Sequence, residues 1–171
     1  VDPLSNRTTY SYDPVGQQTA IQDANNNRTT NSYDGGGKLT VTQNAKSDRT
    51  TYVYDAIGNR TGFIDGRANR VTFQFDDVHR MTTLLDQLGR RTTYSFDAVG
   101  NQTVRIDANA KRTTYSYDEV NRQTGVLYED ATRVTNTYDA LSQRLTMQDS
   151  TGSTTFTYDG VRRLGTVTYP A

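Results

Sequence analysis

The sequence predicts an all-β protein in which tandem hairpins of about 21 residues form one continuous, coiled antiparallel sheet. Three observations support this fold class. An aromatic–Asp pair recurs at a regular spacing, and the chain contains 12 Tyr and 5 Phe together with abundant Thr, all of which suit half-buried strands. No stretch carries the 3.6-residue apolar period of a helix. Because a large twisted sheet cannot stay flat, we expect a spiral shell wall, a tube or a solenoid-like fibre.

The aromatic–Asp pair recurs at intervals of 21 residues six times and then once at 20. The pairs are Tyr12 and Asp13, Tyr33 and Asp34, Tyr54 and Asp55, Phe75 and Asp76, Phe96 and Asp97, Tyr117 and Asp118, Tyr138 and Asp139, and Tyr158 and Asp159. We interpret them as the structural repeat motif of a single array, residues 1–171, with about eight units. The predicted units are 7–27, 28–48, 49–69, 70–90, 91–111, 112–132, 133–152 and 153–171.

Each unit begins with a strand that carries its aromatic residues on one face. The stretch "RTTYSYD" at 112–118 has aromatic residues in its fourth and sixth places, and most other units match it. Residues two apart share one face of a strand. We therefore expect the rings of successive units to form columns across the sheet, each well-placed pair adding roughly 0.5–1.5 kcal/mol beyond its buried area.

The Asp of the motif opens a tight turn. In the third unit Asp55 is followed by Ile57 and Gly58, and Asp side chains bond nearby backbone N–H groups while Gly accepts a positive φ. A second strand such as "NRTGFID" (59–65) and a second turn such as "DANNN" (23–27) lead to the next unit. Symmetric pairing would place the leading Arg opposite the Asp of the second turn, in the pairs Arg7 and Asp23, Arg49 and Asp65, Arg70 and Asp86, Arg91 and Asp107, and Arg133 and Asp149.

Composition excludes several classes of protein. The 19 basic and 19 acidic residues give no net charge, so we expect no nucleic-acid partner. Cysteine is absent, which excludes disulfides and thiolate metal sites. No apolar run is long enough for a membrane span, and we expect no signal peptide within this sequence. The chain opens with "VDPLSN" instead of Met, so we expect a segment of a longer protein.

The sequence offers no set of catalytic residues. His79 is the one histidine and occupies a turn place that is elsewhere Gly, without a nucleophile in its motif. Asp23, Asn25 and Asn27 could ligate Ca²⁺, but these are also ordinary turn residues. We predict no catalytic residue, no cofactor, no metal and hence no enzyme. Four Asn-x-Ser/Thr sequons are candidate glycosylation sites: Asn6, Asn27, Asn59 and Asn101.

The unit Arg-x-Thr-aromatic-x-Tyr-Asp-x-aliphatic-Gly, followed by a second strand ending in Asp, resembles the YD repeat of the RHS-repeat family. The resemblance covers nearly the whole chain, and residues 1–6 look like the tail of a preceding unit. It implies an extracellular or cell-surface protein whose repeats wind into a β-sheet shell. In Rhs proteins and Tc toxins such a shell encloses a C-terminal toxic domain, and teneurins use a similar shell at the cell surface.

Two function classes follow. The first is a non-catalytic structural segment of a large secreted or surface protein, building a toxin-encapsulating shell or an extracellular filament. Its partners would be neighbouring repeats of the same or identical chains and an encapsulated toxin domain. The alternative is a carbohydrate-binding or adhesion module that recognises glycans through exposed Tyr rows. The second strand often begins with a polar residue where the family has Leu, as at Gln18 and Arg60, which favours an open, solvated array.

Overall fold

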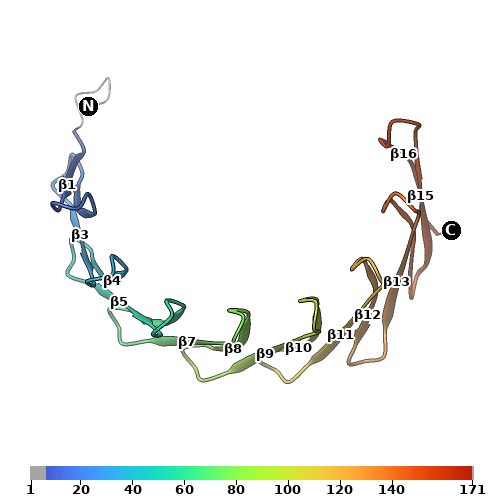
Figure 1. Ribbon diagram of the computed structural model, residues 1–171, viewed down its shortest axis with the longest axis horizontal. Coiled ribbons are helices and arrows are strands. Elements are labelled where there is room, and N and C mark those ends of the chain that lie inside the picture. Colours follow the sequence, from blue (N-terminus) through green and yellow to red (C-terminus); the bar gives the residue numbers. More distant parts are fainter. Residues whose placement is uncertain (1–6, 171) are drawn as a thin grey trace. The chain divides into compact units, whose positions relative to one another are not determined.

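The computed structural model describes residues 7–170, which form sixteen strands and no helix (Figure 1). Strand order follows chain order in one open antiparallel sheet, which confirms the predicted fold class. The strands are β1 (Thr9–Tyr12), β2 (Gln18–Gln22), β3 (Arg28–Tyr33), β4 (Leu39–Gln43), β5 (Arg49–Tyr54), β6 (Arg60–Ile64), β7 (Arg70–Phe75), β8 (Met81–Leu85), β9 (Arg91–Phe96), β10 (Gln102–Ile106), β11 (Arg112–Tyr117), β12 (Gln123–Tyr128), β13 (Arg133–Tyr138), β14 (Arg144–Asp149), β15 (Gly152–Tyr158) and β16 (Leu164–Thr168).

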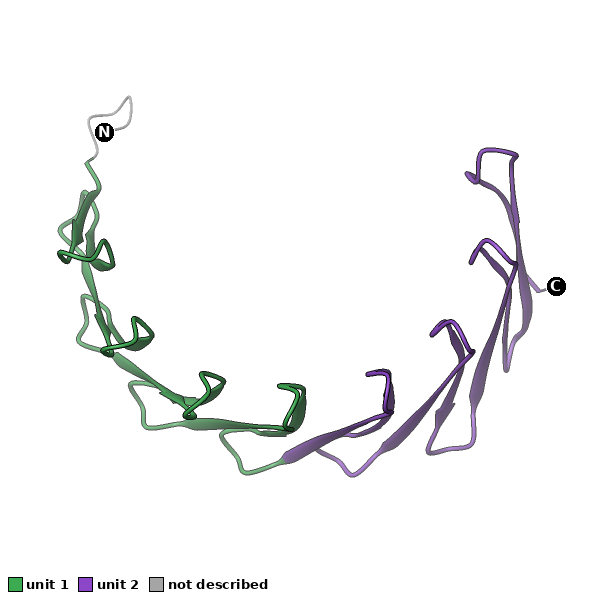
Figure 2. Cartoon of the chain, in the orientation of Figure 1, with its two compact units in different colours: residues 1–90 green, residues 91–171 purple. Residues whose placement is uncertain are grey.

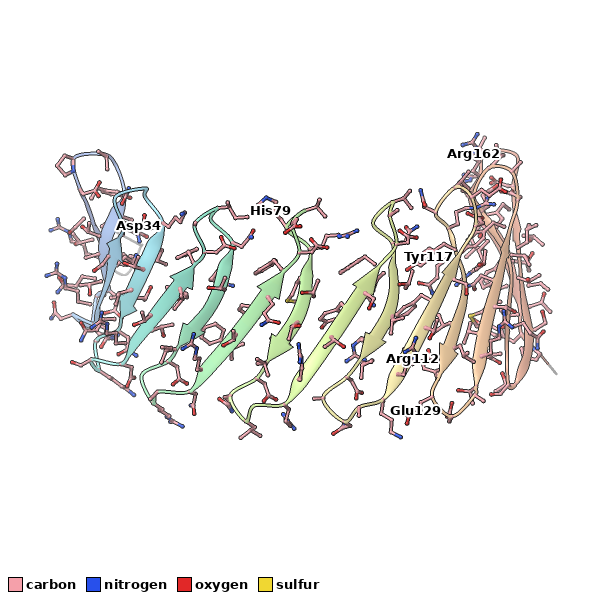
Figure 3. All side chains as sticks on the ribbon, turned by 60° about the horizontal axis from the view of Figure 1, so that its bottom comes forward. Asp34, His79, Arg112, Tyr117, Glu129 and Arg162 are labelled. Carbon is pink, nitrogen blue, oxygen red and sulfur yellow. The ribbon has the colours of Figure 1, made fainter. Side chains whose placement is uncertain are left out.

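The chain divides into two compact units, residues 1–90 and residues 91–171 (Figure 2). The first contains β1 to β8 and the second β9 to β16. Within each unit, successive hairpins lie side by side in a single curved layer. We call the turn that follows the aromatic–Asp pair the YD turn, and the turn that leads to the next hairpin the return turn. The two kinds of turn lie at opposite edges of the layer. Figure 3 shows this in the second unit, where Arg162 and Glu129 mark the two edges.

Both kinds of turn have the same hydrogen-bond geometry. In the first YD turn, Asp13 N donates to Gln17 O at 2.9 Å and Gly16 N donates to Asp13 O at 3.1 Å. The carboxylate of Asp13 accepts from Val15 N at 3.1 Å and from Gln17 N at 2.8 Å. The same four hydrogen bonds recur in the return turn that Asp23 opens. The first hairpin is therefore closed at both ends by one device, a three-residue loop stapled by an acidic side chain.

The last residue of these loops adopts a left-handed conformation. Gly16 has a φ of 86°, and His79 takes the same place in its YD turn with a φ of 64°. Non-glycine residues at this place include Asn26, Ser47, Ala68, Ala110, Asn121, Ala131, Ser142 and Arg162. A side chain with a Cβ is strained there, so the surrounding turn must hold it in place.

A β-bulge follows the YD turn in each hairpin. In the third hairpin Tyr54 pairs with Arg60 but Val53 pairs with Gly62, which leaves Thr61 as the extra residue. The hydroxyl of Thr61 donates to Val53 O at 3.3 Å across the bulge. Equivalent bonds run from Thr40, Thr82 and Thr103 to the carbonyls of Ser32, Gln74 and Ser95. The bulge shifts the register of the rest of the hairpin by one residue.

This shift makes the predicted alignment of Arg with Asp wrong. Thr51 pairs with Ile64, so Arg49 lies level with Gly66 and not with Asp65. The same holds in the other hairpins predicted to align a leading Arg with an Asp, because each carries the bulge. Asp86, which was expected to face Arg70, instead forms an ion pair with Arg90 of its own turn at 2.7 Å. The carboxylate of Asp86 therefore contacts a residue of its own turn and not the neighbouring strand.

The shorter interval before the last unit has a structural cause. Asp149 pairs with Gly152, so this return turn has two loop residues instead of three. One residue is lost between β14 and β15 without disturbing the order of the strands. The array therefore tolerates a change of loop length at a return turn.

The layer has almost no enclosed core. Among residues 7–170, the buried apolar side chains are Ala20 and Val126, and the buried polar ones are Thr83, Thr92, Thr113 and Thr154. Most other strand residues are half-buried, because the sheet has no second layer to cover it. This explains how a chain that is only 33% hydrophobic can fold: a single layer requires few apolar side chains.

Two glycines provide a matched test of the turn conformation. A Cβ at Gly16 or at Gly35 would meet no atom within 4 Å, but only Gly16 has a positive φ. We expect Gly16→Ala to lower the free energy of unfolding by about 1–2 kcal/mol, and Gly35→Ala to leave it unchanged or raise it by a few tenths of a kcal/mol. Urea denaturation followed by circular dichroism measures both. Equal effects of the two substitutions would contradict the assigned turn geometry.

Candidate functional site

The tyrosine in the sixth place of a unit forms a hydrogen bond to the preceding hairpin. The hydroxyl of Tyr54 in β5 donates to the backbone carbonyl of Leu39 in β4 at 2.9 Å. We call this contact the tyrosine joint. It recurs, at 2.9–3.0 Å, from Tyr33 to Gln18 O, Tyr117 to Gln102 O, Tyr138 to Gln123 O and Tyr158 to Arg144 O. The motif tyrosine therefore connects one hairpin to the next.

The acceptor of the joint is available because the ladder between hairpins is short. Between β2 and β3 the paired residues run from Gln22 opposite Arg28 to Ala20 opposite Thr30. The first residue of β2, Gln18, lies beyond this ladder, next to the bulge. Its carbonyl would lack a strand partner on this side, and the hydroxyl of Tyr33 supplies one. The joint thus satisfies a backbone group where the ladder ends.

At one of the joints, partial burial further disfavours ionisation of the tyrosine hydroxyl. Burial raises the pKa of Tyr117, and the nearby Tyr115 and Asp97 raise it further. The phenol therefore stays protonated at neutral pH and can donate its proton to Gln102 O.

Cations add a second contact between hairpins. Lys38 lies over the ring of Tyr54 at 5.8 Å, and Arg122 lies over the ring of Tyr138 at 4.9 Å. Arg122 also pairs with Asp118 of its own turn at 2.7 Å and donates to Asp139 O of the next turn at 2.6 Å. Such a side chain couples one YD turn to the following one.

Two units carry Asn in the fourth place, and these residues strengthen the joint. Asn31 Nδ2 donates to Gln18 O at 3.1 Å, the same carbonyl that Tyr33 uses, while its Oδ1 accepts from Thr42 at 3.1 Å. Asn136 Nδ2 likewise donates to Gln123 O at 3.2 Å. The residue opposite Asn136 is Met147, however, and Asn136 Oδ1 is buried without a hydrogen-bond partner. In this unit the side chain of Asn136 therefore leaves one hydrogen-bond acceptor unused, although its donor bond to Gln123 O is present.

The acidic residues that open the two kinds of turn act as staples. Hydrogen bonds from the side chain of Asn69, and then from its backbone N–H, hold the pKa of Asp65 below its ordinary value. In the YD turn of Asp76, the backbone N–H of Arg80 has the largest effect, and it too lowers the pKa of the carboxyl. Both groups are therefore ionised acceptors at neutral pH. Each carboxylate accepts hydrogen bonds from residues of its own turn.

The residues considered for catalysis or metal binding lie in these turns. His79 is at the YD-turn edge of the first unit (Figure 3), with Nδ1 2.7 Å from Asn59 Oδ1. Both carboxylate oxygens of Asp23 accept hydrogen bonds, from Asn25 N and from the backbone and side chain of Asn27. Residues 7–170 contain no cluster of three His, Cys, Asp or Glu side chains suited to a metal ion. They also contain no helix that could span a membrane.

The sequons lie at the ends of turns. Asn6 is outside the described residues. The side-chain nitrogens of Asn27, Asn59 and Asn101 each donate to the carboxylate of the Asp that opens their turn, at 2.8–3.0 Å. A glycan would have to be attached to this same nitrogen. Modification would therefore compete with the turn contact, and glycosylation stays a prediction.

The surface has shallow depressions that repeat with the fold. Three of about 390–440 Å³ lie beside return turns, and they are lined by residues that include Ser47, Arg49 and Asp65, then Arg91, Asp107 and Ala110, and then Lys111, Tyr128 and Glu129. The last one differs from the others, because Tyr128 replaces the usual Asp or Asn and Lys111 pairs with Glu129 at 3.3 Å. In the first of them the carboxylate of Asp65 accepts hydrogen bonds from the backbone and the side chain of Asn69 in its own turn, both at 2.9 Å.

Comparison with known proteins agrees with the motif. The RHS-repeat family model matches residues 75–112 and 96–133. Residues 75–133 are RHS repeats. The resemblance to the YD-repeat family is thereby confirmed, and the units that the model matches contain the motif pairs from Phe75 to Asp118. No curated protein matches the chain.

Over most of its length the chain is similar in fold to solved structures of Tc toxin proteins. The crystal structure of TcdB2-TccC3-Cdc42 matches 90% of this chain with 16% identity and a TM-score of 0.74. The Photorhabdus luminescens Tc holotoxin pore matches 88% with 17% identity and a TM-score of 0.72. The match covers 10% of the length of each of these two solved chains. At this identity the likeness concerns the fold alone.

The tyrosine joint can be tested where the chain varies between Tyr and Phe. We expect Tyr54→Phe to lower the free energy of unfolding by about 1 kcal/mol, because the carbonyl of Leu39 loses its donor. Phe75→Tyr should raise it by about 0.5–1 kcal/mol, since Phe75 occupies the equivalent place and its new hydroxyl would reach the carbonyl of Arg60. Urea denaturation measures both changes.

Tyr52→Phe is the matched control for this test. Tyr52 lies in the same strand as Tyr54, two residues earlier, in the fourth place of the motif. Its ring contacts Arg60 at 5.7 Å, a contact that Phe would keep. We expect no change in stability. A loss equal to that of Tyr54→Phe would mean that the hydroxyl contact is not what holds neighbouring hairpins.

Proposed function

We propose that this chain is a non-catalytic run of RHS repeats that builds the wall of a β-sheet shell in a large secreted or surface protein. The observation that carries the proposal is the repeated tyrosine joint in a sheet with almost no core. A single layer with matching joints can be lengthened hairpin by hairpin, which is what a wall requires. The division into eight units between residues 7 and 171 is part of the proposal.

Several features suit a wall better than a site of chemistry. Acidic side chains such as Asp65 and Asp86 are held by donors of their own turns, so they offer no free acid or base. Two of the depressions lie at equivalent places in the repeat, whereas a selective site would be unique. The motif pairs would then have a structural role, in which the Asp stabilises the turn of its hairpin and the aromatic residue contacts the preceding hairpin. These pairs run from Tyr12 and Asp13 to Tyr158 and Asp159.

The partners follow from the same role. Neighbouring repeats would extend the wall, and an enclosed toxin domain would be its cargo, as the likeness in fold to Tc toxin components suggests. An extracellular or cell-surface location accords with this role. An extracellular filament is the second form that the same joints could build.

The glycan-binding alternative is less well supported. It requires rows of tyrosines with free hydroxyl groups, but Tyr33, Tyr54 and Tyr138 direct their hydroxyls to backbone carbonyls. A sugar would have to compete with those bonds. We therefore do not retain it as a function of this chain.

Transplanting the array tests the wall function. Residues 7–170 would replace the segment of TcdB2-TccC3 that superposes on them, with the original segment re-inserted through the same junctions as the control. Electron microscopy should show closed particles of the same size that retain the toxin domain. Soluble chimaeras that stay open while their circular dichroism remains β-rich would contradict a wall-building function.

A further inference from the structure

Three turns of the array place a glycine directly after the aspartate that opens them. They are the YD turns of Asp34 with Gly35 and Asp159 with Gly160, and the return turn of Asp65 with Gly66. A backbone nitrogen that belongs to glycine is not shielded by a side chain, so it can attack the carboxyl carbon of the preceding aspartate. The Asp-Gly pair is therefore the sequence in which aspartate cyclises to an imide most readily.

The turn geometry brings the two reacting atoms together. In the second hairpin, Oδ1 of Asp34 accepts hydrogen bonds from Gly36 N and from Lys38 N, both at 2.9 Å. To reach these donors, the side chain folds back over the peptide bond between Asp34 and Gly35, which brings its carboxyl carbon towards Gly35 N. The same pair of hydrogen bonds forms in the other two turns. All three aspartates therefore share this approach.

In two of the turns a side chain also holds the second carboxylate oxygen. Oδ2 of Asp65 accepts from Asn69 Nδ2 at 2.9 Å, and Oδ2 of Asp159 accepts from Arg163 Nε at 2.7 Å. The side chain and then the backbone N–H of Asn69 lower the pKa of Asp65, and the backbone N–H and then the guanidinium of Arg163 lower the pKa of Asp159. Cyclisation needs the neutral acid, because one carboxyl oxygen leaves as water. Both donors therefore oppose it.

Asp34 lacks this protection. The residue equivalent to Arg163 in its turn is Lys38, whose Nζ lies over the ring of Tyr54 at 5.8 Å. Among residues 7–170, no side chain donates a hydrogen bond to Oδ2 of Asp34. Asp34 is also exposed, at the YD-turn edge of the first unit (Figure 3). The oxygen that has to leave is thus held by no donor.

The backbone that follows Asp34 is free to rotate. A Cβ at Gly35 would meet no atom within 4 Å, and the whole loop, residues 35–37, is glycine. Gly66 differs, because a Cβ there would come within 3.0–3.1 Å of residues 48–49 in the neighbouring return turn. A loop of three glycines reaches the attacking conformation more readily than a loop that carries side chains.

We propose that Asp34 is a site of spontaneous isomerisation, at which Gly35 N attacks the carboxyl carbon to give a cyclic imide that opens to isoaspartate. In the first step a bond forms between Gly35 N and Asp34 Cγ, and one Cγ–O bond breaks. The oxygen leaves as water, with its own proton and the amide proton. In the second step water adds to the original backbone carbonyl carbon of Asp34, whose bond to Gly35 N breaks while the nitrogen regains a proton. The chain then runs through Cγ and contains one additional methylene group.

The product cannot close the YD turn in the same way. Gly37 N donates to Asp34 O at 3.0 Å, and isomerisation converts this backbone carbonyl into a carboxylate outside the main chain. The loop becomes one backbone atom longer directly after Tyr33, whose hydroxyl joins the second hairpin to Gln18 O at 2.9 Å. The modification therefore weakens the attachment of the second hairpin to the first. This inference is independent of the wall-building function.

The unmodified chain contains its own comparison. The 171-residue protein is kept at neutral pH in ¹⁸O-labelled water, and trypsin then releases the three Asp-Gly pairs in separate peptides, residues 29–38, 61–67 and 145–162. Each passage through the imide incorporates one oxygen from the solvent, and peptide mapping separates isoaspartate from aspartate. We expect both signals to appear at Asp34 about tenfold faster than at Asp65 or Asp159, because each of those carboxylates has one more hydrogen bond to lose. Equal rates in the folded chain would overturn the proposal.

The same incubation in urea separates the effect of the fold from that of the sequence. No turn holds its carboxylate in the unfolded chain, so the three rates should converge. A preference for Asp34 that persists unchanged in urea would mean that the fold does not select this site, and the proposal would then be wrong.

Two conservative exchanges test the cause of the preference. Lys38→Arg gives Asp34 the donor that Arg163 gives Asp159, and it should slow isomerisation at Asp34 about tenfold. Arg163→Lys should accelerate isomerisation at Asp159. Both variants keep the charge of the turn, and circular dichroism establishes that they fold. Gly35→Ala, which is expected to leave stability nearly unchanged, shields the attacking nitrogen and should suppress the reaction at Asp34. A rate at Asp34 that responds to neither Lys38→Arg nor Gly35→Ala would refute the mechanism.

Discussion

A hydrogen bond from a tyrosine hydroxyl to a backbone carbonyl of the preceding hairpin sets the alignment of neighbouring hairpins wherever the joint place is Tyr. Phe75 and Phe96, which stand in the same place, have no hydroxyl. With no second layer, packing cannot fix how neighbouring hairpins align, and the ladder from Ala20 to Gln22 is short enough to slip. A slip of one residue would turn Tyr33 to the other face of the sheet, away from Gln18 O. The joint therefore favours one register, and it does so again at other hairpins along the chain.

The same constraint explains the composition of the chain. A single layer needs few large apolar side chains, so the residues that matter are those that complete backbone hydrogen bonding. Thr61 bridges the bulge, Asp55 staples the YD turn, and Tyr54 serves the carbonyl at the end of the ladder. Each of these roles needs a polar atom at a set distance from the backbone. This is why a sequence with low hydropathy still specifies an ordered sheet.

Periodicity was enough to predict strands and turns from the sequence, because each has its own local chemistry. The Asp that accepts backbone N–H groups and the Gly with positive φ both leave a clear signature, as at Asp13 and Gly16. The bulge was not predicted, since a strand pattern looks alike before and after a shift of one residue. Its signal was present, however, in the Thr that recurs after the first residue of the second strand, as in Thr40 and Thr61. The tyrosine joint could not be predicted from the sequence, because its acceptor is a backbone carbonyl and every residue has one.

Stepwise shortening of the array tests the account most directly. Chains lacking one, two, three or more hairpins from the C-terminal end would be prepared, and the free energy of unfolding of each would be measured by urea denaturation. If hairpins are held by successive similar joints, the free energy should fall by a similar step for each hairpin removed, and fragments of one or two hairpins should be unfolded. A stable two-hairpin fragment, or a free energy that does not depend on the number of hairpins, would contradict the account.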